Sequence, residues 1–272
     1  MNRMKLPVEF LARIQDLEAG RTQPPVLRHA STVVLLRDRD GLEVFMLRRV
    51  SSMAFAPGAY VFPGGAVDAR DAEYDLDAPD WSGVLGADRA TALELVCAAA
   101  RETFEEAHVL LAGPSEDTLV EDTTDLEPDR LALLDRSQSL AGFLKARGLV
   151  LRADLLRPWA HWITPVVETK RYDTRFFVAG MPEGQRALDV STEADRVAWL
   201  RPAEALAQAE KGAMFMMPPT LATLTDLTAF GTVAEVLAAE RDIMVHQPDA
   251  KIIDGEPYLV LPDHAAHHYP GM

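Results

Sequence analysis

The sequence predicts an α/β protein in three α/β/α layers, with helices packed on both faces of a mixed β-sheet. Several runs of β-branched and apolar residues predict strands, and one long stretch without Gly or Pro predicts a helix. Strands and helices follow one another without strict alternation, which favours a mixed sheet. The chain has 272 residues, 48% of them hydrophobic, which is enough for one substantial core.

The first elements expected along the chain are one helix and a pair of strands. Residues 7–19 have the amphipathic pattern of a short helix. Residues 30–37 and 43–49 are strand-like runs on either side of Asp40-Gly41, a pair typical of hairpin turns. Residues 59–67 are expected to continue as extended chain.

The longest expected helix runs from Asp88 to Val109, a stretch that is rich in Ala and contains no Gly or Pro. Its apolar residues recur at steps of three and four and so share one face. They are Leu93, Val96, Cys97, Ala100, Phe104 and Ala107. Glu102, Glu105 and Glu106 fall on the other side, so we expect this helix to bury one face and display three carboxylates on the opposite one.

The second half of the chain is expected to complete the sheet and to add helices. The strands expected there are 160–169, 173–180 and 196–200, and a closing hairpin of 251–253 with 257–261. The helices expected there are 127–135, 138–147, 202–210 and a helical region from 218 to about 242.

These elements suggest one main domain with two additions. Residues 1–29 are expected to form an N-terminal helical arm, 30–265 a single domain, and 266–272 a tail. Within the domain, residues 68–87 and 113–158 interrupt the expected core elements and are interpreted as insertions.

The formal net charge is −15, and this excess of acid bears on the choice of ligand. Such a field disfavours long polyanions, so nucleic acid is not an expected partner. A small phosphorylated substrate remains compatible, because a bound metal and local arginines can reverse the potential within a cleft.

Cysteine usage and hydropathy indicate where the chain functions. Cys97 is the only cysteine, which excludes an internal disulfide and fits a reducing cytoplasm. No apolar run reaches the roughly 18 residues of a membrane span, so no membrane association is expected. Glu9, Arg13 and Asp16 interrupt the N-terminal segment, which argues against a signal peptide.

The hexapeptide that begins at Arg101 and ends at Glu106 carries the main chemical signal. Three carboxylates within one helical turn repel one another unless they are neutralised. A hard divalent cation such as Mg²⁺ prefers carboxylate oxygen and would neutralise them, whereas a solvated surface patch is the structural alternative. Arg101 is placed to pair with one of the carboxylates.

This hexapeptide and the upstream Phe62-Pro63-Gly64-Gly65 together resemble the Nudix box of the Nudix hydrolases. The box runs Gly, five residues, Glu, seven residues, Arg-Glu, an apolar residue, any residue, Glu-Glu, any residue, Gly. Here Gly65 and Arg101 are 36 positions apart, so about 22 residues are inserted between the two halves. Counting back eight positions from Arg101, Leu93 stands where the box has Glu.

Two box positions are therefore open to interpretation. Four acids are candidates to replace the missing Glu, and spacing leaves the choice between them open: Asp68, Asp71, Glu73 and Glu94. His108 stands at the final Gly of the box, where it would cap the helix C-terminus as a favourable cation.

An interruption of this kind resembles the coenzyme A diphosphatase branch of the family. The stretches from Phe55 to Gly65 and from Trp159 to Phe177 are similar to that branch. Its coenzyme A signature is half kept: Arg49 matches the first signature Arg, whereas Ala54 and Val50 depart from the second Arg and from the Ser.

The resemblance implies a Nudix-like α/β/α sandwich and roles for individual residues. It implies metal ligation of Mg²⁺ or Mn²⁺ by Gly65, Glu102, Glu105 and Glu106. The implied catalytic residues are Glu105, Glu106, Arg101 and Glu193, with Glu106 preferred over Glu193 as general base. The implied substrate contacts are Arg49, Gly64, Arg171 and Arg175.

The reaction implied is hydrolysis of a pyrophosphate bond in coenzyme A or an acyl derivative, giving 3′,5′-ADP and (acyl-)phosphopantetheine. Two alternatives stay open. One is a Nudix hydrolase of another dinucleotide, such as NADH or ADP-ribose, which Ala54 and Val50 allow. The other is an inactive nucleotide sensor, suggested by Leu93 and His108. Family analogy also suggests a homodimer.

Overall fold

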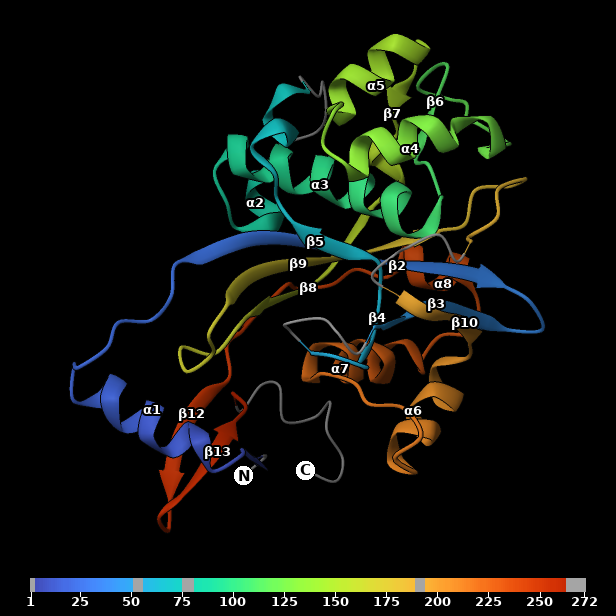
Figure 1. Ribbon diagram of the computed structural model, residues 1–272. Helices are drawn as coiled ribbons and strands as arrows, with labels where there is room; N and C mark the ends of the chain where they lie inside the picture. Colours follow the sequence, from blue (N-terminus) through green and yellow to red (C-terminus); the bar gives the residue numbers. More distant parts are fainter. Residues whose placement is uncertain (1–2, 51–55, 75–80, 189–193, 263–272) are drawn as a thin grey trace.

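The computed structural model describes residues 3–50, 56–74, 81–188 and 194–262 (Figure 1). Its centre is a mixed sheet whose strand order is β10-β3-β2-β9-β8-β11, with β4 paired to β3 and β5 paired to β2. The strands are β2 (Leu27–Asp38), β3 (Leu42–Arg49), β4 (Tyr60–Val61), β5 (Gly64–Ala66), β8 (Arg157–Ile163), β9 (Arg171–Gly180), β10 (Ala194–Leu200) and β11 (Val245–His246). This arrangement confirms the predicted α/β class.

The mixed character of the sheet comes from two parallel pairs. β2 runs parallel to β9 from Leu27↔Arg171 to Leu36↔Gly180, and β11 runs parallel to β8. The remaining pairs in this sheet are antiparallel, including the predicted hairpin of β2 and β3. The long parallel pair matters for the site, because it brings the first residues of β2 and β9 side by side.

Alternation along the strands builds two cores, one on each face of the sheet. On one face, Val33, Leu35 and Phe177 pack toward α3, α4 and α5; on the other, Val34 and Leu36 pack toward α6, α7 and α8. Figure 1 shows the two helical layers on opposite sides of the sheet. The helices are α3 (Arg89–Ala107), α4 (Glu127–Leu134), α5 (Leu140–Arg147), α6 (Pro202–Glu210), α7 (Pro218–Leu227) and α8 (Val233–Ala238).

Helix α3 is more enclosed than the sequence predicted. It begins where the Asp88 carboxylate accepts a hydrogen bond from the Thr91 N–H (3.0 Å), and it ends at His108, whose φ is 59°. Every residue from Leu95 to Phe104 is buried, so the prediction of a single buried face was wrong. The reason is that α3 contacts β2 on one side and β5, α4 and the short 3₁₀ helix η1 (Ala69–Glu73) on others.

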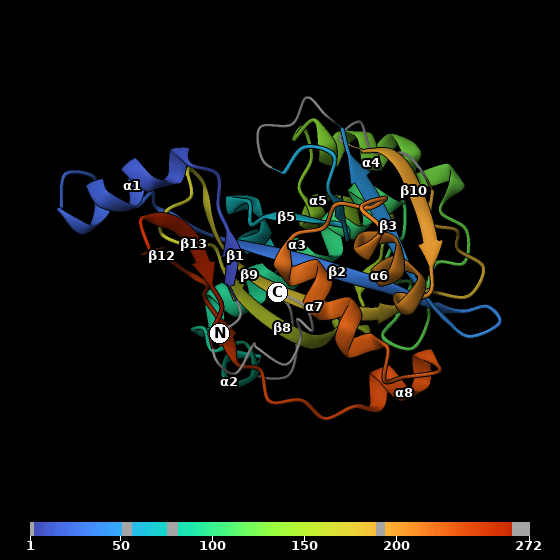
Figure 2. The same cartoon turned by 90° about the horizontal axis from the view of Figure 1, so that it is seen from below.

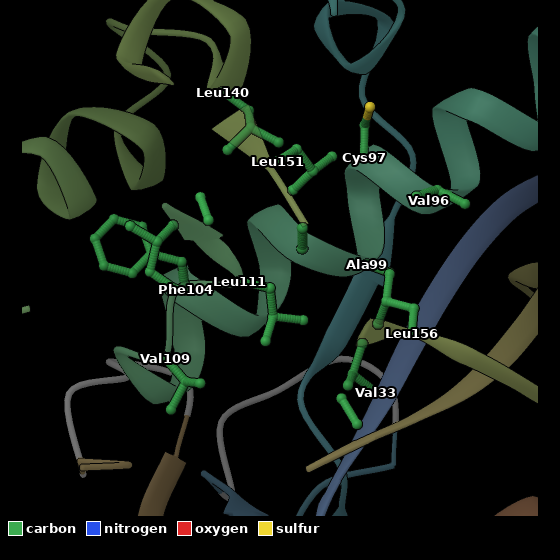
Figure 3. Packing of buried hydrophobic residues seen from close by; sticks show 14 of the residues in the cluster. Val33, Val96, Cys97, Ala99, Phe104, Val109, Leu111, Leu140, Leu151 and Leu156 are labelled. Carbon is green, nitrogen blue, oxygen red and sulfur yellow. The ribbon is translucent and has the colours of Figure 1, made fainter. Parts of the chain in front are cut away.

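Side chains of the inserted segments and of α3 share one packed cluster, in which Figure 3 shows Leu151 near Cys97 and Leu156 near Ala99. The Phe104 ring stacks on that of Phe143 of α5, with centroids 5.4 Å apart. The predicted helices near 127–135 and 138–147 are thus confirmed as α4 and α5. Short elements complete this layer: α2 (Ser82–Leu85), β6 (Ala112–Gly113), η2 (Thr124–Leu126), β7 (Val150–Leu151) and η3 (Ala153–Leu155).

A second sheet joins the two ends of the described chain. β1 (Arg3–Lys5) pairs with β13 (Glu256–Val260), which pairs with β12 (Asp249–Ile253). α1 (Glu9–Glu18) packs on β12 and β13, and Figure 2 shows these elements gathered at one side of the molecule. The predicted helix and hairpin are confirmed, whereas three-residue β1 was too short to show a periodic pattern.

Two expected elements differ in extent. β8 ends at Ile163 instead of continuing to 169, because Pro165 follows and has no N–H for a ladder. The helical region from 218 divides into α7 and α8, because Thr232 caps a new helix by accepting from the Glu235 N–H. Among the described helices, none combines the length and the apolar character needed to cross a membrane.

The enclosure of α3 predicts a large loss of stability for Phe104→Ala. The Phe104 ring is fully buried, so its removal leaves a cavity and should lower the free energy of unfolding by about 3–5 kcal/mol. Urea denaturation would measure this. Phe215→Ala is the matched control, since Phe215 is 56% exposed and its loss should cost under about 1 kcal/mol. Equal losses for both variants would contradict this packing.

Candidate active site

A cleft of about 1110 Å³ opens where β5 and η1 meet α3. It brings together most of the residues that the sequence suggested: Arg49, Gly64, Gly65, Arg101, Glu102, Glu105 and Glu106. These residues come from β3, β5 and α3, which lie far apart along the chain but converge here. Polar and charged side chains dominate the cleft wall, which suits a charged ligand.

The two glycines are required for close approach. A Cβ on Gly65 would lie 2.5 Å from Oε1 of Glu102, and one on Gly64 would lie 2.5 Å from the carbonyl oxygen of Ser31. The contact at Gly64 is with backbone, so this position needs Gly, whereas a Cβ on Gly65 would displace the Glu102 carboxylate that Arg101 holds. The Gly64 N–H donates to Oε2 of Glu106 (2.9 Å), which fixes this carboxylate against β5. The glycines therefore do more than form a tight turn.

The Arg101 side chain forms hydrogen bonds to several elements of the site. Its Nε and Nη2 donate to the two carboxylate oxygens of Asp71 at 2.8 and 3.0 Å, a bidentate pair buried from solvent. Its Nη1 donates to Oε1 of Glu102 (2.7 Å) and more weakly to Glu105 (3.3 Å). Nη2 also donates to the carbonyl of Ala66 (3.0 Å). One guanidinium thus connects η1, β5 and two of the three helix carboxylates.

Burial shifts the titration of this cluster. Burial acts against the charged form of Arg101, but the hydrogen bond to Asp71 and the nearby carboxylates outweigh it, and the pKa of Arg101 is raised. Burial, assisted by the charge of Glu105, raises the pKa of Glu102 to about 7. Burial also raises the pKa of Glu105. The positive charge of Arg101 therefore does not fully compensate the burial of the Glu102 and Glu105 carboxylates.

Basic side chains line much of the remaining cleft wall, in a chain that is acidic as a whole. They are Arg28, His29, Arg49, Arg70, Arg136 and Lys170. The buried Nε of Arg49 has no hydrogen-bond partner among the described residues. Arg48 points the other way and forms a bidentate pair with Asp195 (2.6 and 2.9 Å), as the alternation of a strand predicts.

Two residues suggested by the sequence, Arg175 and Arg171, are not brought into this cleft. Arg175 is buried elsewhere and donates to Asp173, His161 and the carbonyl of Leu85 (2.8 Å), so it serves as an internal ion-pair partner. Arg171 donates to the carbonyl of Thr164 (3.2 Å) and lines a smaller neighbouring hollow. Glu193 lies outside the described residues.

A family model described as the NUDT19 Nudix domain matches residues 86–227, slightly more than half of the chain. The chain belongs to the Nudix family. A solved relative, the Nudix hydrolase from Alicyclobacillus acidocaldarius, is 31% identical with a TM-score of 0.67, over 79% of this chain and 96% of that one.

Curated Nudix relatives are longer than this chain. The acyl-coenzyme A diphosphatase NUDT19 of Xenopus laevis is 27% identical over 239 residues, which cover 71% of this chain and 62% of that protein. Putative nudix hydrolase 7 of Caenorhabditis elegans is 30% identical over 198 residues, which cover 72% of this chain and 59% of that protein. The chain thus spans about 60% of the length of these relatives.

Within the Nudix box, the structure identifies the acid that takes the place of the missing Glu. Asp71 is six positions after Gly65, where the box has Glu, and it is the acid that pairs with Arg101. Leu93 packs against the core instead. The signal was present in the sequence, because counting forward from Gly65 reaches Asp71, whereas counting back from Arg101 crosses the insertion. We place the start of the insertion after Asp71.

His108 shows how a side chain replaces the last Gly of the box. Its left-handed φ of 59° explains why Gly suits this position. His108 is tolerated because its Nδ1 lies 3.0 Å from the Thr123 hydroxyl and its Nε2 lies 3.2 Å from Glu127. Burial lowers the pKa of His108 despite Glu127, which disfavours the predicted cation.

Three other residues with reactive or flexible side chains are structural. Burial raises the pKa of Cys97 to about 12, so the thiol stays protonated and packs as a small apolar group. Met214 and Met216 are buried in the core on the side of the sheet covered by α6 and α7.

The donor set fits a hard divalent cation. Three carboxylates from one helical turn share the cleft with the backbone of Gly65, and oxygen donors are those that Mg²⁺ and Mn²⁺ prefer. Among the described residues, no three acidic, His or Cys side chains already form a cage. Arg101 engages Glu102 and Glu105, and Gly64 engages Glu106. An ion would therefore draw these carboxylates from their present partners.

Asp71→Asn should be the most damaging substitution among the four acids considered for the missing box position. It leaves the buried Arg101 charge without its bidentate partner, so we expect the free energy of unfolding to fall by about 3 kcal/mol. Chemical denaturation measures this loss. Glu94→Gln is the control, because Glu94 lines the cleft without a described ion pair and should change stability by under about 0.5 kcal/mol. A reversed order of effects would remove Asp71 from this role.

The raised pKa of Glu102 predicts a pH dependence of stability in metal-free protein. In the unfolded chain this carboxyl titrates near its ordinary value of about 4.3. In the folded chain its pKa is about 7. Between the two values the folded state holds a proton that the unfolded state has released. The free energy of unfolding therefore decreases as pH rises through this window.

Glu102→Gln removes this titration and should reduce the decline, so that the variant is more stable than the unsubstituted protein above about pH 7. Urea denaturation between about pH 5 and 8, with chelator present, measures the difference. Glu116→Gln, at an exposed loop position, should keep the original slope. Identical slopes for all three proteins would show that Glu102 does not titrate in this range.

Proposed function

We propose that this Nudix protein is a metal-dependent diphosphatase that hydrolyses the pyrophosphate bond of coenzyme A or acyl-coenzyme A, giving 3′,5′-ADP and (acyl-)phosphopantetheine. The observation that carries the proposal is the cleft itself. It joins three carboxylates, a buried Arg101–Asp71 support and a glycine backbone to a lining of cationic side chains. An acidic half and a basic half in one cleft suit a metal ion together with a polyanionic substrate.

Mg²⁺ or Mn²⁺ would be held by the carboxylates of Glu102, Glu105 and Glu106 with the backbone carbonyl of Gly65. Bound there, the ion would neutralise charge on the phosphate oxygens and acidify an attacking water. The raised pKa values of Glu102 and Glu105 support this assignment, since they report carboxylates that lack sufficient positive charge.

The protein's own side chains would supply orientation and proton transfer. Arg101 keeps Glu102 and Glu105 in fixed directions, because Asp71 holds its guanidinium from behind. Glu106 is our first choice as general base, since its carboxylate lines the cleft and is anchored by the Gly64 N–H. Glu193 remains the alternative base. Arg49, with its unsatisfied buried Nε, would clamp a phosphate oxygen.

The preference for coenzyme A rests on similarity to relatives named acyl-coenzyme A diphosphatases. Ala54 and Val50 depart from the coenzyme A signature, and this keeps NADH and ADP-ribose as alternative substrates. An inactive sensor is less well supported, because Asp71 restores the box pair that Leu93 seemed to have removed.

The proposal is tested by incubating the full chain and Mg²⁺ or Mn²⁺ with coenzyme A, acyl-coenzyme A, NADH and ADP-ribose, with products identified by mass spectrometry. Release of 3′,5′-ADP and phosphopantetheine, abolished by chelator, is the expected result. AMP from NADH alone would indicate the second substrate class. Tight nucleotide binding without turnover of any compound would indicate a sensor.

Glu105→Gln and Glu106→Gln should each lower kcat by at least about 100-fold, because each removes one anionic metal ligand or the base. Mn²⁺ binding, measured by calorimetry, should weaken together with turnover when a metal ligand is lost. Retained Mn²⁺ binding with lost turnover would indicate loss of the proton acceptor instead. Glu116→Gln is the charge-matched control on an exposed loop and should retain both properties. Unchanged turnover in both variants would refute the metal assignment.

A further inference from the structure

A second, smaller hollow of about 290 Å³ lies beside the cleft, and we call it the basic annex. Its lining is Pro25, Val26, Arg28, Thr169, Lys170, Arg171 and Tyr172. Arg28, Lys170 and Tyr172 also line the main cleft, so the two spaces adjoin one another. The lining of the annex contains three cationic side chains and no acidic one among the described residues.

The parallel pairing of β2 and β9 creates this concentration of charge. Leu27 lies beside Arg171 and Arg28 beside Tyr172, so the first residues of both strands meet at one end of the sheet. Lys170 comes from the turn that immediately precedes β9. The strand register therefore brings these basic residues together at one end of the sheet.

The basic side chains of the annex have no ion-pair partner among the described residues, unlike three arginines elsewhere in the sheet. Arg37, Arg48 and Arg175 form ion pairs with Glu43, Asp195 and Asp173. By contrast, the side chains of Arg28 and Lys170 form no hydrogen bond or ion pair with any residue that the structure describes. The Arg171 side chain donates one hydrogen bond, from its Nε to the Thr164 carbonyl oxygen (3.2 Å). A chain with a net charge of −15 thus keeps an unneutralised basic group next to its proposed reaction cleft.

We infer that the basic annex is a subsite for a phosphomonoester on the ribose of the substrate. The inference rests on the proposed function, in which the nucleotide pyrophosphate lies in the adjoining cleft. A phosphomonoester carries nearly two charges and several acceptor oxygens, which Arg and Lys donors match. Arg171, which the sequence suggested as a substrate contact, thereby gains a place at the ligand although it lies outside the main cleft.

The same chemistry is present in two nucleotide classes, the 3′-phosphate of coenzyme A and the 2′-phosphate of NADPH. Two substrate pairs distinguish them: coenzyme A with 3′-dephospho-coenzyme A, and NADPH with NADH. We expect kcat/KM to be at least about tenfold higher for the phosphorylated member of the coenzyme A pair. A preference confined to NADPH would assign the annex to the 2′-phosphate.

The variant that tests the annex is the double substitution Arg28→Gln with Lys170→Gln. It should reduce kcat/KM at least about tenfold more on the phosphorylated member of the preferred pair than on its partner. Arg171 is left intact because its Nε supports the turn at Thr164. Arg39→Gln is the matched control: it makes the same type of charge change just beyond the opposite end of β2 and should leave the preference unaltered.

A binding measurement makes the inference independent of turnover. Calorimetry of the full chain with 3′,5′-ADP and with 5′-AMP should show tighter binding of 3′,5′-ADP by at least about tenfold, lost in the double variant. If this holds but no dinucleotide is hydrolysed, the annex stands and the proposed diphosphatase activity fails. If hydrolysis occurs with equal kcat/KM within each pair, or the double variant weakens both members equally, the annex inference is overturned and the activity stands.

Discussion

The buried ion pair of Arg101 with Asp71 is the interaction on which the site depends. α3 carries three carboxylates on a segment that the core and the insertions enclose, and burial of such charges is unfavourable without compensation. Arg101 supplies the compensating charge, and Asp71 fixes the direction of its guanidinium. Because the same guanidinium also reaches the Ala66 carbonyl, it attaches the β5 edge to the helix. The position of the glycine backbone against Glu102 follows from this attachment.

This pair also explains how the two halves of the Nudix box meet despite a long insertion between them. The inserted residues leave the site after Asp71 and return at α3, and the two ends are held together by Arg101 and Asp71. The entropic cost of lengthening a closed loop grows only slowly with its length. The box therefore survives as a spatial arrangement although its sequence spacing is lost.

The predicted elements that proved correct are those with strong local signals. The β2–β3 hairpin, the long helix, α4, α5 and the closing hairpin each have a clear period or turn pair, and the cleft contains the acids that the box motif indicated. The errors have non-local causes. Enclosure of α3 depends on α4 and β5, which a helical wheel does not contain. Arg175 alternates with cleft-lining Tyr172 and Thr174 along β9, and the sequence alone does not show which set faces the cleft.

Charge distribution links the fold to the proposed chemistry. Arg37, Arg48 and Arg175 of the sheet are neutralised by acids, and the chain as a whole has an excess of Asp and Glu. At the cleft the relation is reversed, because Arg28, Arg49 and Lys170 form no ion pair with the described residues. A polyanion approaching an acidic protein is attracted only where local cations exceed local acids. The unpaired cations therefore determine where a phosphorylated substrate can bind. The parallel register of β2 and β9 places these cations beside the carboxylates of α3, and not at the hairpin end of the sheet.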